Sequence, residues 1–277
     1  MPELPEVEST RRAIAPAMVR ARITAVQVRR PDLREPFPRM FARRLTGQTV
    51  LALSRRAKYL LASLSSGDTL LMHLGMSGSF RVLRSATPNA APIDIGLHDH
   101  VVFHLSSGKV VVFNDPRRFG VMDLIPADRL EDYPTLSRLG LEPLSDDFDA
   151  AALARVCRGK KVSLKAALLD QRVVAGLGNI YAVEALHVAG LSPTRRASTI
   201  ATASGAPRDS AVRLVAAIKV VLGQAIARQS SRGAYGDSRF LVYDRQDEAC
   251  PRQQCRGTIR RRTQGGRSTF YCPACQR

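Results

Sequence analysis

The spacing of apolar residues changes along the chain and predicts different elements in its two halves. A helix is predicted at residues 5–18, where one face is largely apolar: Val7, Arg11, Ile14 and Met18. Between residues 21 and 125, short β-branched or leucine-rich runs alternate with turns rich in Gly, Pro, Asn and Ser. They predict strands at residues 23–28, 49–53, 59–64, 101–105 and 109–113. Such regular strands without helical patterns between them predict an antiparallel sandwich or barrel.

The second half of the chain has helical periodicity. Residues 131–149 carry two prolines and several acidic residues, which is typical of an exposed interdomain connection. Helices are predicted near residues 150–158, 163–171, 180–189 and 208–228. The last has an apolar stripe that we assign to a core: Leu214, Val215, Ile218, Val221, Leu222, Ala225 and Ile226. The fold class is therefore α+β with two domains: a β-sandwich with an N-terminal helix at 1–132, a linker at 133–149, a helical domain at 150–242 and a β-containing tail at 243–277.

Charge narrows the range of partners. The 42 Lys and Arg residues exceed the 24 Asp and Glu residues, and a formal charge of +18 predicts an anionic partner. Nucleic acid suits this charge better than a membrane, because we find no 18-residue apolar run, polybasic amphipathic helix or lipidation motif. The N-terminus lacks the basic and apolar regions of a secretory signal, which predicts a cytoplasmic location. The alternative is a soluble basic protein without such a partner.

Four of the five cysteines form two close pairs in the last 28 residues. Cys250 and Cys255 enclose four residues, Cys272 and Cys275 enclose two, and sixteen residues separate the pairs. Four thiolates at this spacing can close a tetrahedral Zn²⁺ site, and a reducing compartment favours zinc over disulfides. The residues between the pairs include five arginines and no acidic residue, so the hairpin would also present positive charge to a duplex. A purely structural clip is the alternative. Cys157 is expected to be a buried thiol.

Several motifs together resemble the formamidopyrimidine-DNA glycosylase family. The chain begins Met-Pro-Glu-Leu-Pro-Glu-Val-Glu, and further matches follow in order at residues 56–59, 73–78, 115–120, 176–181 and 265–272. The resemblance spans nearly the whole chain, and the joint occurrence of these motifs is far more specific than any single one. The chain departs from the family at the first cysteine pair, which usually encloses two residues, so that Gln253 and Gln254 look like an insertion.

The resemblance implies a base-excision repair enzyme with damaged double-stranded DNA as its partner. Such an enzyme removes oxidised purines (8-oxoguanine opposite C and formamidopyrimidines) and cleaves the abasic strand by β,δ-elimination. Pro2, freed by removal of Met1, would be a secondary amine with a pKa of roughly 8 that forms a Schiff base with the sugar. Glu3 would act as general acid, Lys58 would assist β-elimination, and Arg267 would clamp a phosphate during δ-elimination.

The same resemblance assigns DNA-binding residues and domain roles. Met76, Arg117 and Phe119 resemble the residues that fill the space left by a flipped nucleotide, and Arg117 would pair with the orphaned cytosine. Asn179 is expected to cap the helix that follows the Gly-rich turn. Further DNA contacts are expected from His73, His98, Arg118, Lys160, Lys165 and Tyr235, although His98, Lys160 and Lys165 could equally be solvated surface groups. The resemblance makes 1–132 the catalytic domain, 150–242 a helix-two-turn-helix DNA-binding domain, and 243–277 a zinc finger.

The resemblance also implies one structural Zn²⁺, a monomer without membrane association, and a nucleoid-associated location when the protein is bound to DNA. Two other functions stay open from the sequence. An endonuclease VIII-type enzyme would share the N-terminal proline but prefer oxidised pyrimidines, and Leu4, Met76 and the Arg117/Phe119 pair favour the guanine branch. A non-catalytic zinc-ribbon protein would explain the charge and the cysteines, but it gives no reason for Pro2, Glu3 and Lys58.

Overall fold

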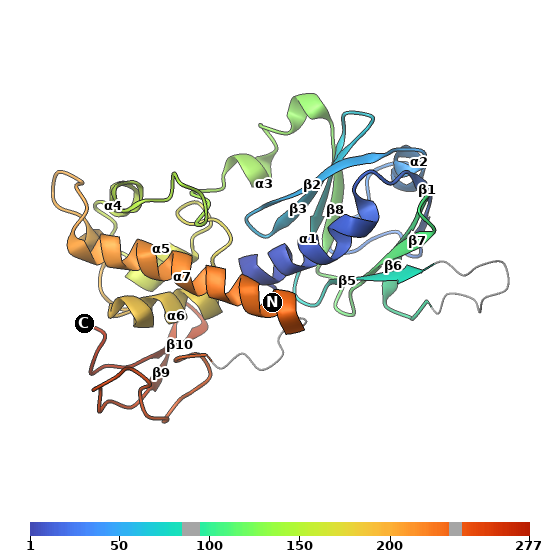
Figure 1. The fold of residues 1–277 in the computed structure, drawn as a ribbon. Coiled ribbons are helices and arrows are strands. Elements are labelled where there is room, and N and C mark those ends of the chain that lie inside the picture. The colour runs from blue at the N-terminus through green and yellow to red at the C-terminus, as the bar shows by residue number, and fades with distance from the viewer. Residues whose placement is uncertain (85–94, 233–239) are drawn as a thin grey trace. The chain divides into compact units, whose positions relative to one another are not determined.

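The chain divides into two compact units. The computed structural model describes residues 1–84, 95–232 and 240–277. One unit comprises Met1–Ser137 and the other Arg138–Arg277 (Figure 1). The division falls within residues 133–149, the segment that the sequence predicts as the linker.

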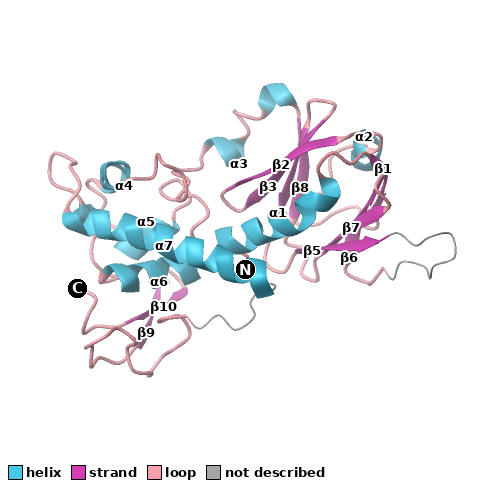
Figure 2. Ribbon diagram, in the orientation of Figure 1, coloured by secondary structure: helices cyan, strands magenta, loops and turns pink. Residues whose placement is uncertain are grey.

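The first unit contains two four-stranded antiparallel sheets and an N-terminal helix (Figure 2). One sheet has the order β1-β6-β7-β5 and the other has the order β2-β3-β4-β8. The helix α1 (Leu4–Met18) packs against both sheets, and the main apolar core of this unit includes Ile14 from α1, Leu60 from β3 and Phe103 from β6. The bounds of the other elements are β1 (Ile23–Val28), α2 (Phe41–Leu45), β2 (Val50–Arg56), β3 (Tyr59–Leu64), β4 (Thr69–His73), β5 (Ser79–Arg84), β6 (Asp99–Leu105), β7 (Lys109–Asn114), β8 (Val121–Ile125) and α3 (Pro134–Ser137).

These strands confirm the predicted antiparallel β architecture, but three of them were not predicted. The strand β4 is buried along almost its whole length, so it lacks the alternation that reveals a half-exposed strand. The strand β5 is the edge of its sheet and largely exposed, which leaves it with little apolar pattern. The strand β8 begins immediately after the Pro116–Gly120 turn, whose residues hide its start.

The second unit is helical and ends in a two-stranded hairpin. Its main elements are α4 (Ala150–Cys157), α5 (Leu164–Leu169), α6 (Asn179–Ala189), α7 (Asp209–Arg232), β9 (Arg260–Gln264) and β10 (Arg267–Tyr271). The apolar stripe predicted on α7 is buried, with Leu214, Ile218 and Leu222 fully inaccessible. Cys157 is also fully buried, as expected, and burial raises the pKa of its thiol to about 11.

Among the described residues, one helix has the length and mean hydropathy of a possible membrane span, although Arg213 and Lys219 interrupt its apolar run. Residues Asp209–Gln229 of α7 are long and apolar enough, by length and composition alone, to cross a membrane. Half of this apolar window is buried inside the protein, because α7 packs against α4 and α6. The apolar segment is therefore that of a helix packed in the protein core. The exposed side of α7 carries charged residues such as Arg213.

The buried stripe of α7 generates a stability prediction. Replacing Leu222 by Ala should lower the free energy of unfolding by about 2–5 kcal/mol, because a cavity remains where the side chain was inaccessible. Val220 lies on the same helix but is 50% exposed, so Val220→Ala should change the free energy by less than about 1 kcal/mol. Urea unfolding followed by far-UV circular dichroism measures both. Equal effects would contradict the core assignment.

Candidate functional site

The N-terminal residues are held by the start of α1. Glu3 is the N-cap residue, and Glu3 and Glu6 form a capping box in which the Glu6 carboxylate accepts the Glu3 N–H at 2.8 Å. Met1 is 42% exposed, Pro2 is half-buried and Glu3 is buried. The residues that the sequence singles out therefore lie at an ordered helix start, whereas the methionine that precedes them is accessible.

Glu8 ties this helix to the adjacent sheet. Its buried carboxylate accepts hydrogen bonds from Arg11 at 2.9 Å and Arg12 at 2.8 Å on the same helix, and from Arg55 of β2 at 3.3 Å. Burial alone would raise the pKa of Glu8, but the hydrogen bonds from Arg11 and Arg12 and the charge of Arg55 outweigh it and lower the pKa to about 2. Glu8 is therefore an ionised anchor at neutral pH.

The turn between β2 and β3 carries Lys58. The Arg55 guanidinium donates to the carbonyl of Ala57 at 2.9 Å, and Ala57 has a positive φ of 53°. Because Arg55 also binds Glu8, the turn that bears Lys58 is linked to α1. Lys58 itself is 9% exposed.

His73, at the end of β4, is a neutral residue near Lys58. Burial, with the charges of Lys58 and Arg34, lowers the pKa of His73 to about 4. Its Nδ1 accepts the Gly75 N–H at 3.1 Å, which places the imidazole proton on Nε2. His73 can thus offer an N–H donor at neutral pH.

A buried carboxylate joins the two loops that carry the predicted void-filling residues. Asp115 is fully buried and accepts the Ser77 hydroxyl at 2.5 Å and the Gly120 N–H at 2.7 Å. The Ser77 oxygen in turn accepts the Arg117 N–H at 3.1 Å. Gly75 lies so close to the other loop that a Cβ there would meet the Phe119 carbonyl carbon at 2.3 Å. Residues 74–78 and 115–120 therefore form one locked pair of loops.

The outer side of these loops presents the predicted residues. Met76 is 36% exposed, Phe119 is 41% exposed, and Arg117 lies with its guanidinium carbon 4.8 Å from the centre of the Phe119 ring. Arg118 is exposed on the same loop with a positive φ of 57°. His98 is exposed, and its carbonyl accepts the Asp115 N–H at 2.9 Å. The structure thus brings together a group of exposed cationic, aromatic and apolar side chains.

In the second unit, two predicted residues converge on the backbone next to Arg267. The carbonyl of Ser268 accepts Lys165 Nζ at 3.2 Å and Asn179 Nδ2 at 3.0 Å, and Lys165 also donates to the Thr269 hydroxyl at 2.7 Å. Burial, with the charge of Arg267, lowers the pKa of Lys165 to about 8. Arg267 is exposed at the start of β10 and lines a pocket of about 510 Å³ together with Lys165.

Two local expectations are corrected here. Asn179 does not cap α6, because Gly178 is the N-cap residue and the Asn179 amide is directed to the hairpin. Lys165 is 1% exposed, which excludes the alternative of a solvated surface group. Lys160 is half-buried after α4, with its backbone N–H bound to the Cys157 carbonyl. Tyr235 lies outside the described residues.

The four tail cysteines form a cluster suited to zinc. Their Sγ atoms all lie within 4.8 Å of one another, with 3.8 Å between Cys250 and Cys275 and 3.7 Å between Cys255 and Cys272. Zn–S bonds of about 2.3 Å in a tetrahedron imply S···S separations of about 3.8 Å, so the donor set fits zinc. Gly257 packs inside this cluster, since a Cβ there would meet Cys272 Sγ at 2.6 Å. One structural Zn²⁺ therefore holds the tail together.

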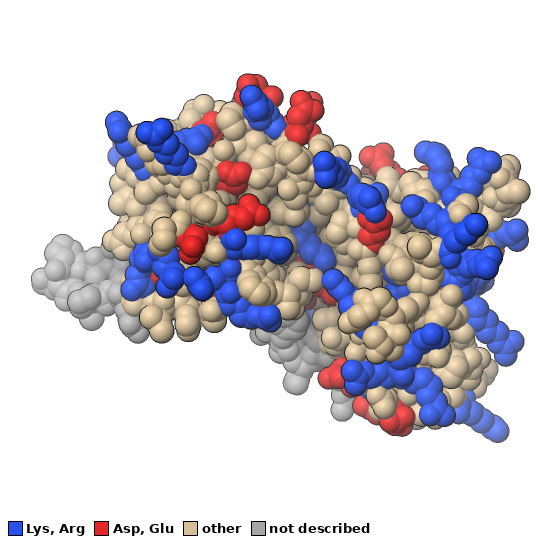
Figure 3. Space-filling view, turned by 180° about the vertical axis from the view of Figure 1, so that it is seen from behind, with Lys and Arg blue, Asp and Glu red and all other residues tan. Residues whose placement is uncertain are grey.

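Arginines dominate the hairpin that the cysteines close. Arg260, Arg261, Arg262 and Arg267 are all exposed on β9 and β10. Figure 3 shows Lys and Arg side chains widely distributed over the face opposite to that of Figure 1. Such a surface suits a polyanion.

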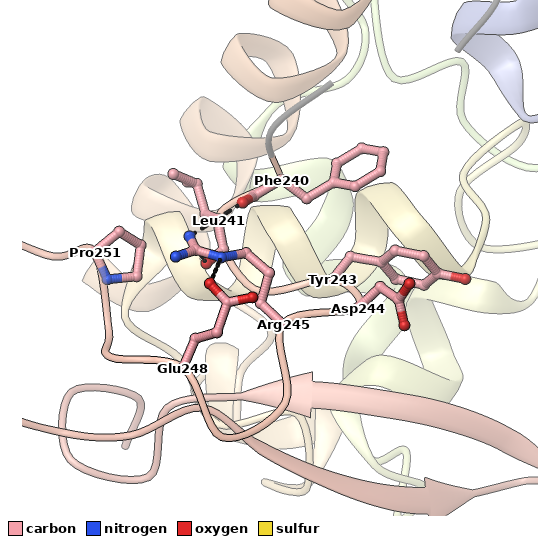
Figure 4. A pocket seen from close by; sticks show the side chains of 7 residues that line it. All are labelled: Phe240, Leu241, Tyr243, Asp244, Arg245, Glu248 and Pro251. Atoms are coloured by element: carbon pink, nitrogen blue, oxygen red, sulfur yellow. Dashed lines mark hydrogen bonds and ion pairs between the residues drawn. The ribbon is translucent and has the colours of Figure 1, made fainter. Parts of the chain in front are cut away.

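Sequence reasoning missed a pocket of about 860 Å³ beside the tail. Arg245 lies in this pocket and donates to the Glu248 carboxylate at 2.8 Å and to the Leu241 carbonyl at 3.1 Å (Figure 4). The lining residues are Phe240, Leu241, Tyr243, Asp244, Arg245, Glu248 and Pro251. The buried Glu184 of α6 supports this segment by accepting three successive backbone N–H groups, those of residues 241–243. No local sequence motif predicts this pocket, because the residue that holds its backbone, Glu184, is distant from it in sequence.

Family comparisons cover almost the whole chain. The formamidopyrimidine-DNA glycosylase N-terminal domain matches residues 1–122, the formamidopyrimidine-DNA glycosylase H2TH domain matches 139–234, and the zinc finger found in FPG and IleRS matches 247–277. The zinc finger is thus one of three matched regions. A non-catalytic zinc-ribbon protein would not account for the other two.

Individual relatives agree with these matches. The formamidopyrimidine-DNA glycosylases of Bradyrhizobium sp. strain BTAi1 and Rhodopseudomonas palustris strain BisA53 are each 57% identical over 293 residues and cover 100% of both chains. Among solved structures, the Lactococcus lactis Fpg with an abasic site containing DNA has a TM-score of 0.86 at 30% identity over 100% of both chains. The same enzyme with FAPY-dG containing DNA has a TM-score of 0.83 at 31% identity, covering 99% and 100%. MutM (Fpg) from Thermus thermophilus has a TM-score of 0.81 at 36% identity, covering 99% and 98%.

The locked loops generate a prediction about Gly75. Gly75→Ala should cost about 1–3 kcal/mol more of unfolding free energy than Gly108→Ala, because the added methyl group would collide with the Phe119 backbone. Both glycines have positive φ, 62° and 74°, but a Cβ at Gly108 meets nothing within 4 Å. Both variants place an alanine at a positive φ, so the difference between their unfolding free energies in urea measures the cost of the steric collision. Equal costs for the two variants would show that the loops separate easily.

Proposed function

The chain belongs to the formamidopyrimidine-DNA glycosylase family, and on that premise we propose how its own residues carry out the reaction. The protein is a base-excision repair enzyme with DNA glycosylase and AP lyase activities, a structural zinc ion and damaged double-stranded DNA as its partner. Its substrates are oxidised purines, 8-oxoguanine opposite C and formamidopyrimidines, and it works as a monomer.

Pro2 is the proposed nucleophile. With Met1 in place its nitrogen is an amide without a basic lone pair, so Met1 must first be removed. The free secondary amine attacks C1′ of the damaged nucleotide, the base leaves, and opening of the sugar ring gives an iminium. The observation that carries this assignment is the helix start at Glu3, whose capping box orders the backbone immediately after Pro2 while Met1 remains exposed.

The iminium acidifies the C2′ protons of the sugar, and two eliminations follow. Loss of a C2′ proton expels the 3′-phosphate oxygen from C3′ and forms a C2′=C3′ double bond. Loss of the C4′ proton, which the conjugated iminium acidifies, then expels the 5′-phosphate oxygen from C5′. Glu3 is the proposed general acid at the sugar ring oxygen, and Lys58 assists β-elimination. Arg267 holds a phosphate by bidentate hydrogen bonds and positions the leaving oxygen, because a guanidinium is a poor proton donor.

The proposed DNA contacts come from both units. Met76, Arg117 and Phe119 fill the space that the flipped nucleotide leaves in the duplex, and their exposure on locked loops supports this role. Asn179, Lys160 and the hairpin arginines approach the phosphates, whereas the buried Lys165 acts by holding the strand that bears Arg267. Other proposed DNA contacts are His73, His98, Arg118 and Tyr235.

The proposed domains follow the sequence boundaries, with catalysis at 1–132, a linker at 133–149, DNA binding at 150–242 and the zinc finger at 243–277. A repair enzyme acting on DNA is intracellular and DNA-associated. We place it in the cytoplasm, and on the nucleoid when it is bound to DNA.

Chemical trapping tests the nucleophile. The Met1-processed chain should form a covalent adduct with a duplex containing 8-oxoguanine opposite C when sodium borohydride is present, and without borohydride it should leave phosphates on both flanks of the gap. A chain that keeps an uncleaved N-terminal extension should give no adduct, because Pro2 is then an amide, while it binds the duplex within a few-fold of the processed chain. An adduct from the extended chain would refute Pro2 as the nucleophile. Cleavage of only an oxidised-pyrimidine duplex would indicate an endonuclease VIII-type preference.

Arg117 should control the preference for the opposite base. Arg117→Ala should reduce 8-oxoguanine excision opposite C by roughly 5- to 150-fold, since a bidentate contact with a base contributes about 1–3 kcal/mol. Excision of 8-oxoguanine opposite A should fall much less. The ratio of the excision rate opposite C to the rate opposite A should therefore decrease. Arg129→Ala removes another exposed arginine of the same unit and should leave the ratio unchanged. Single-turnover rates on the two duplexes measure it, and a wild-type ratio in Arg117→Ala would contradict the role.

A further inference from the structure

A histidine lies against the zinc site although it is not one of its ligands. His187, in the last turn of α6, is 3% exposed, and its Nε2 lies 3.4 Å from Cys250 Sγ. Its Nδ1 is buried and has no hydrogen-bond partner among the described residues. The Cys250 sulfur is therefore the polar atom that the imidazole contacts.

The number of protons on each group determines which atom is the donor and which is the acceptor in this contact. A zinc-bound Cys250 is a thiolate and can only accept a hydrogen bond. A neutral imidazole has a single N–H, and placing it on Nδ1 would bury an unpaired donor and direct the Nε2 lone pair at the thiolate. The Nε2–H tautomer satisfies the donor and stabilises the negative sulfur.

The loop between Cys250 and Cys255 is attached to the same helix end through one of its four residues. This residue, Arg252, donates its guanidinium to the carbonyl of His187 and, at 3.2 Å, to that of Val188. The turn closes through the Cys255 N–H, which binds the Arg252 carbonyl at 3.0 Å. The His187 carbonyl also accepts the Gly190 N–H at 3.0 Å, and a cation at these last carbonyls of the helix complements the helix dipole. His187 is thus bound twice, through its side chain by Cys250 and through its backbone by Arg252.

We propose that His187 is an outer-sphere ligand of the zinc site, donating an Nε2–H···Sγ hydrogen bond to Cys250, and that Arg252 is the positioning residue that holds the cysteine loop against it. The bond spreads the thiolate charge and restrains Cys250, so zinc dissociates more slowly. The additional length of the loop brings Arg252 to the end of α6 and makes the zinc site continuous with that helix.

Zinc release from the full-length holoprotein tests the proposal without using catalysis. In excess chelator, with a colorimetric zinc indicator, His187→Phe should release zinc roughly 10- to 100-fold faster than the wild type, the range typical of lost outer-sphere bonds. His187→Gln, whose amide can place an N–H near the Nε2 position, should stay within a few-fold. Val188→Ala alters an exposed side chain in the same turn and should release zinc at the wild-type rate. A wild-type rate in His187→Phe would overturn the proposal.

A second measurement needs no loss of the side chain. The chain has five histidines, so a long-range ¹H–¹⁵N spectrum of the wild-type holoprotein is simple, and the His187→Gln spectrum identifies the His187 signals. The proposal requires the Nε2–H tautomer, and an Nδ1–H tautomer would exclude the bond even if His187→Phe fails to fold. Arg252→Met should also accelerate zinc release, because the loop loses its attachment to α6. An unchanged rate in Arg252→Met would remove Arg252 from the proposal.

Discussion

The carboxylate of Asp115 makes the interaction on which the paired loops 74–78 and 115–120 depend. A fully buried carboxylate is costly unless donors replace water, and here the Ser77 hydroxyl and the Gly120 N–H do so. Each donor comes from one of the two loops, while the Asp115 carbonyl accepts His100 Nε2 at 2.9 Å from β6. Asp115 and Gly120 lie in the same loop, so the Ser77 hydroxyl is the donor that joins the two loops, and separating them would remove this buried hydrogen bond. This constraint allows Met76 and Phe119 to stand exposed without collapsing onto the protein.

Buried polar groups also hold the hairpin of the second unit in place. Arg267 is exposed, but the carbonyl of the next residue, Ser268, is held by both Lys165 and Asn179. Burying the Lys165 ammonium is costly, and its lowered pKa reports that cost. Two donors on one carbonyl fix the backbone next to the exposed Arg267 guanidinium. In both units, then, buried polar groups set the position of exposed cationic side chains, which is how a site is preorganised for a charged ligand.

The sequence predicts those structural features that depend on a local pattern of residues. The bounds of β1 and β3 and the buried stripe of α7 follow from periodicity, and the fit of the cysteines to zinc follows from their spacing. The expected cap at Asn179 is wrong because a partner 89 residues away outweighs the local preference of an asparagine for a helix start. The role of Glu184 was missed for the same reason, since its three backbone partners lie at least 57 residues away. Such tertiary contacts have no signature within a local window.

A nucleophile at a chain terminus raises a physical difficulty, because termini usually fray. The proposed chemistry needs an N-terminal amine, since only there is a backbone nitrogen basic, and it also needs that amine to be fixed. The capping box orders residue 3, and the ionised Glu8 secures the same helix to Arg55 and the turn at Ala57. Order therefore begins directly after Pro2. An internal lysine would be easier to hold, but it would have to be desolvated to lose its proton at neutral pH, whereas a terminal secondary amine needs little such adjustment.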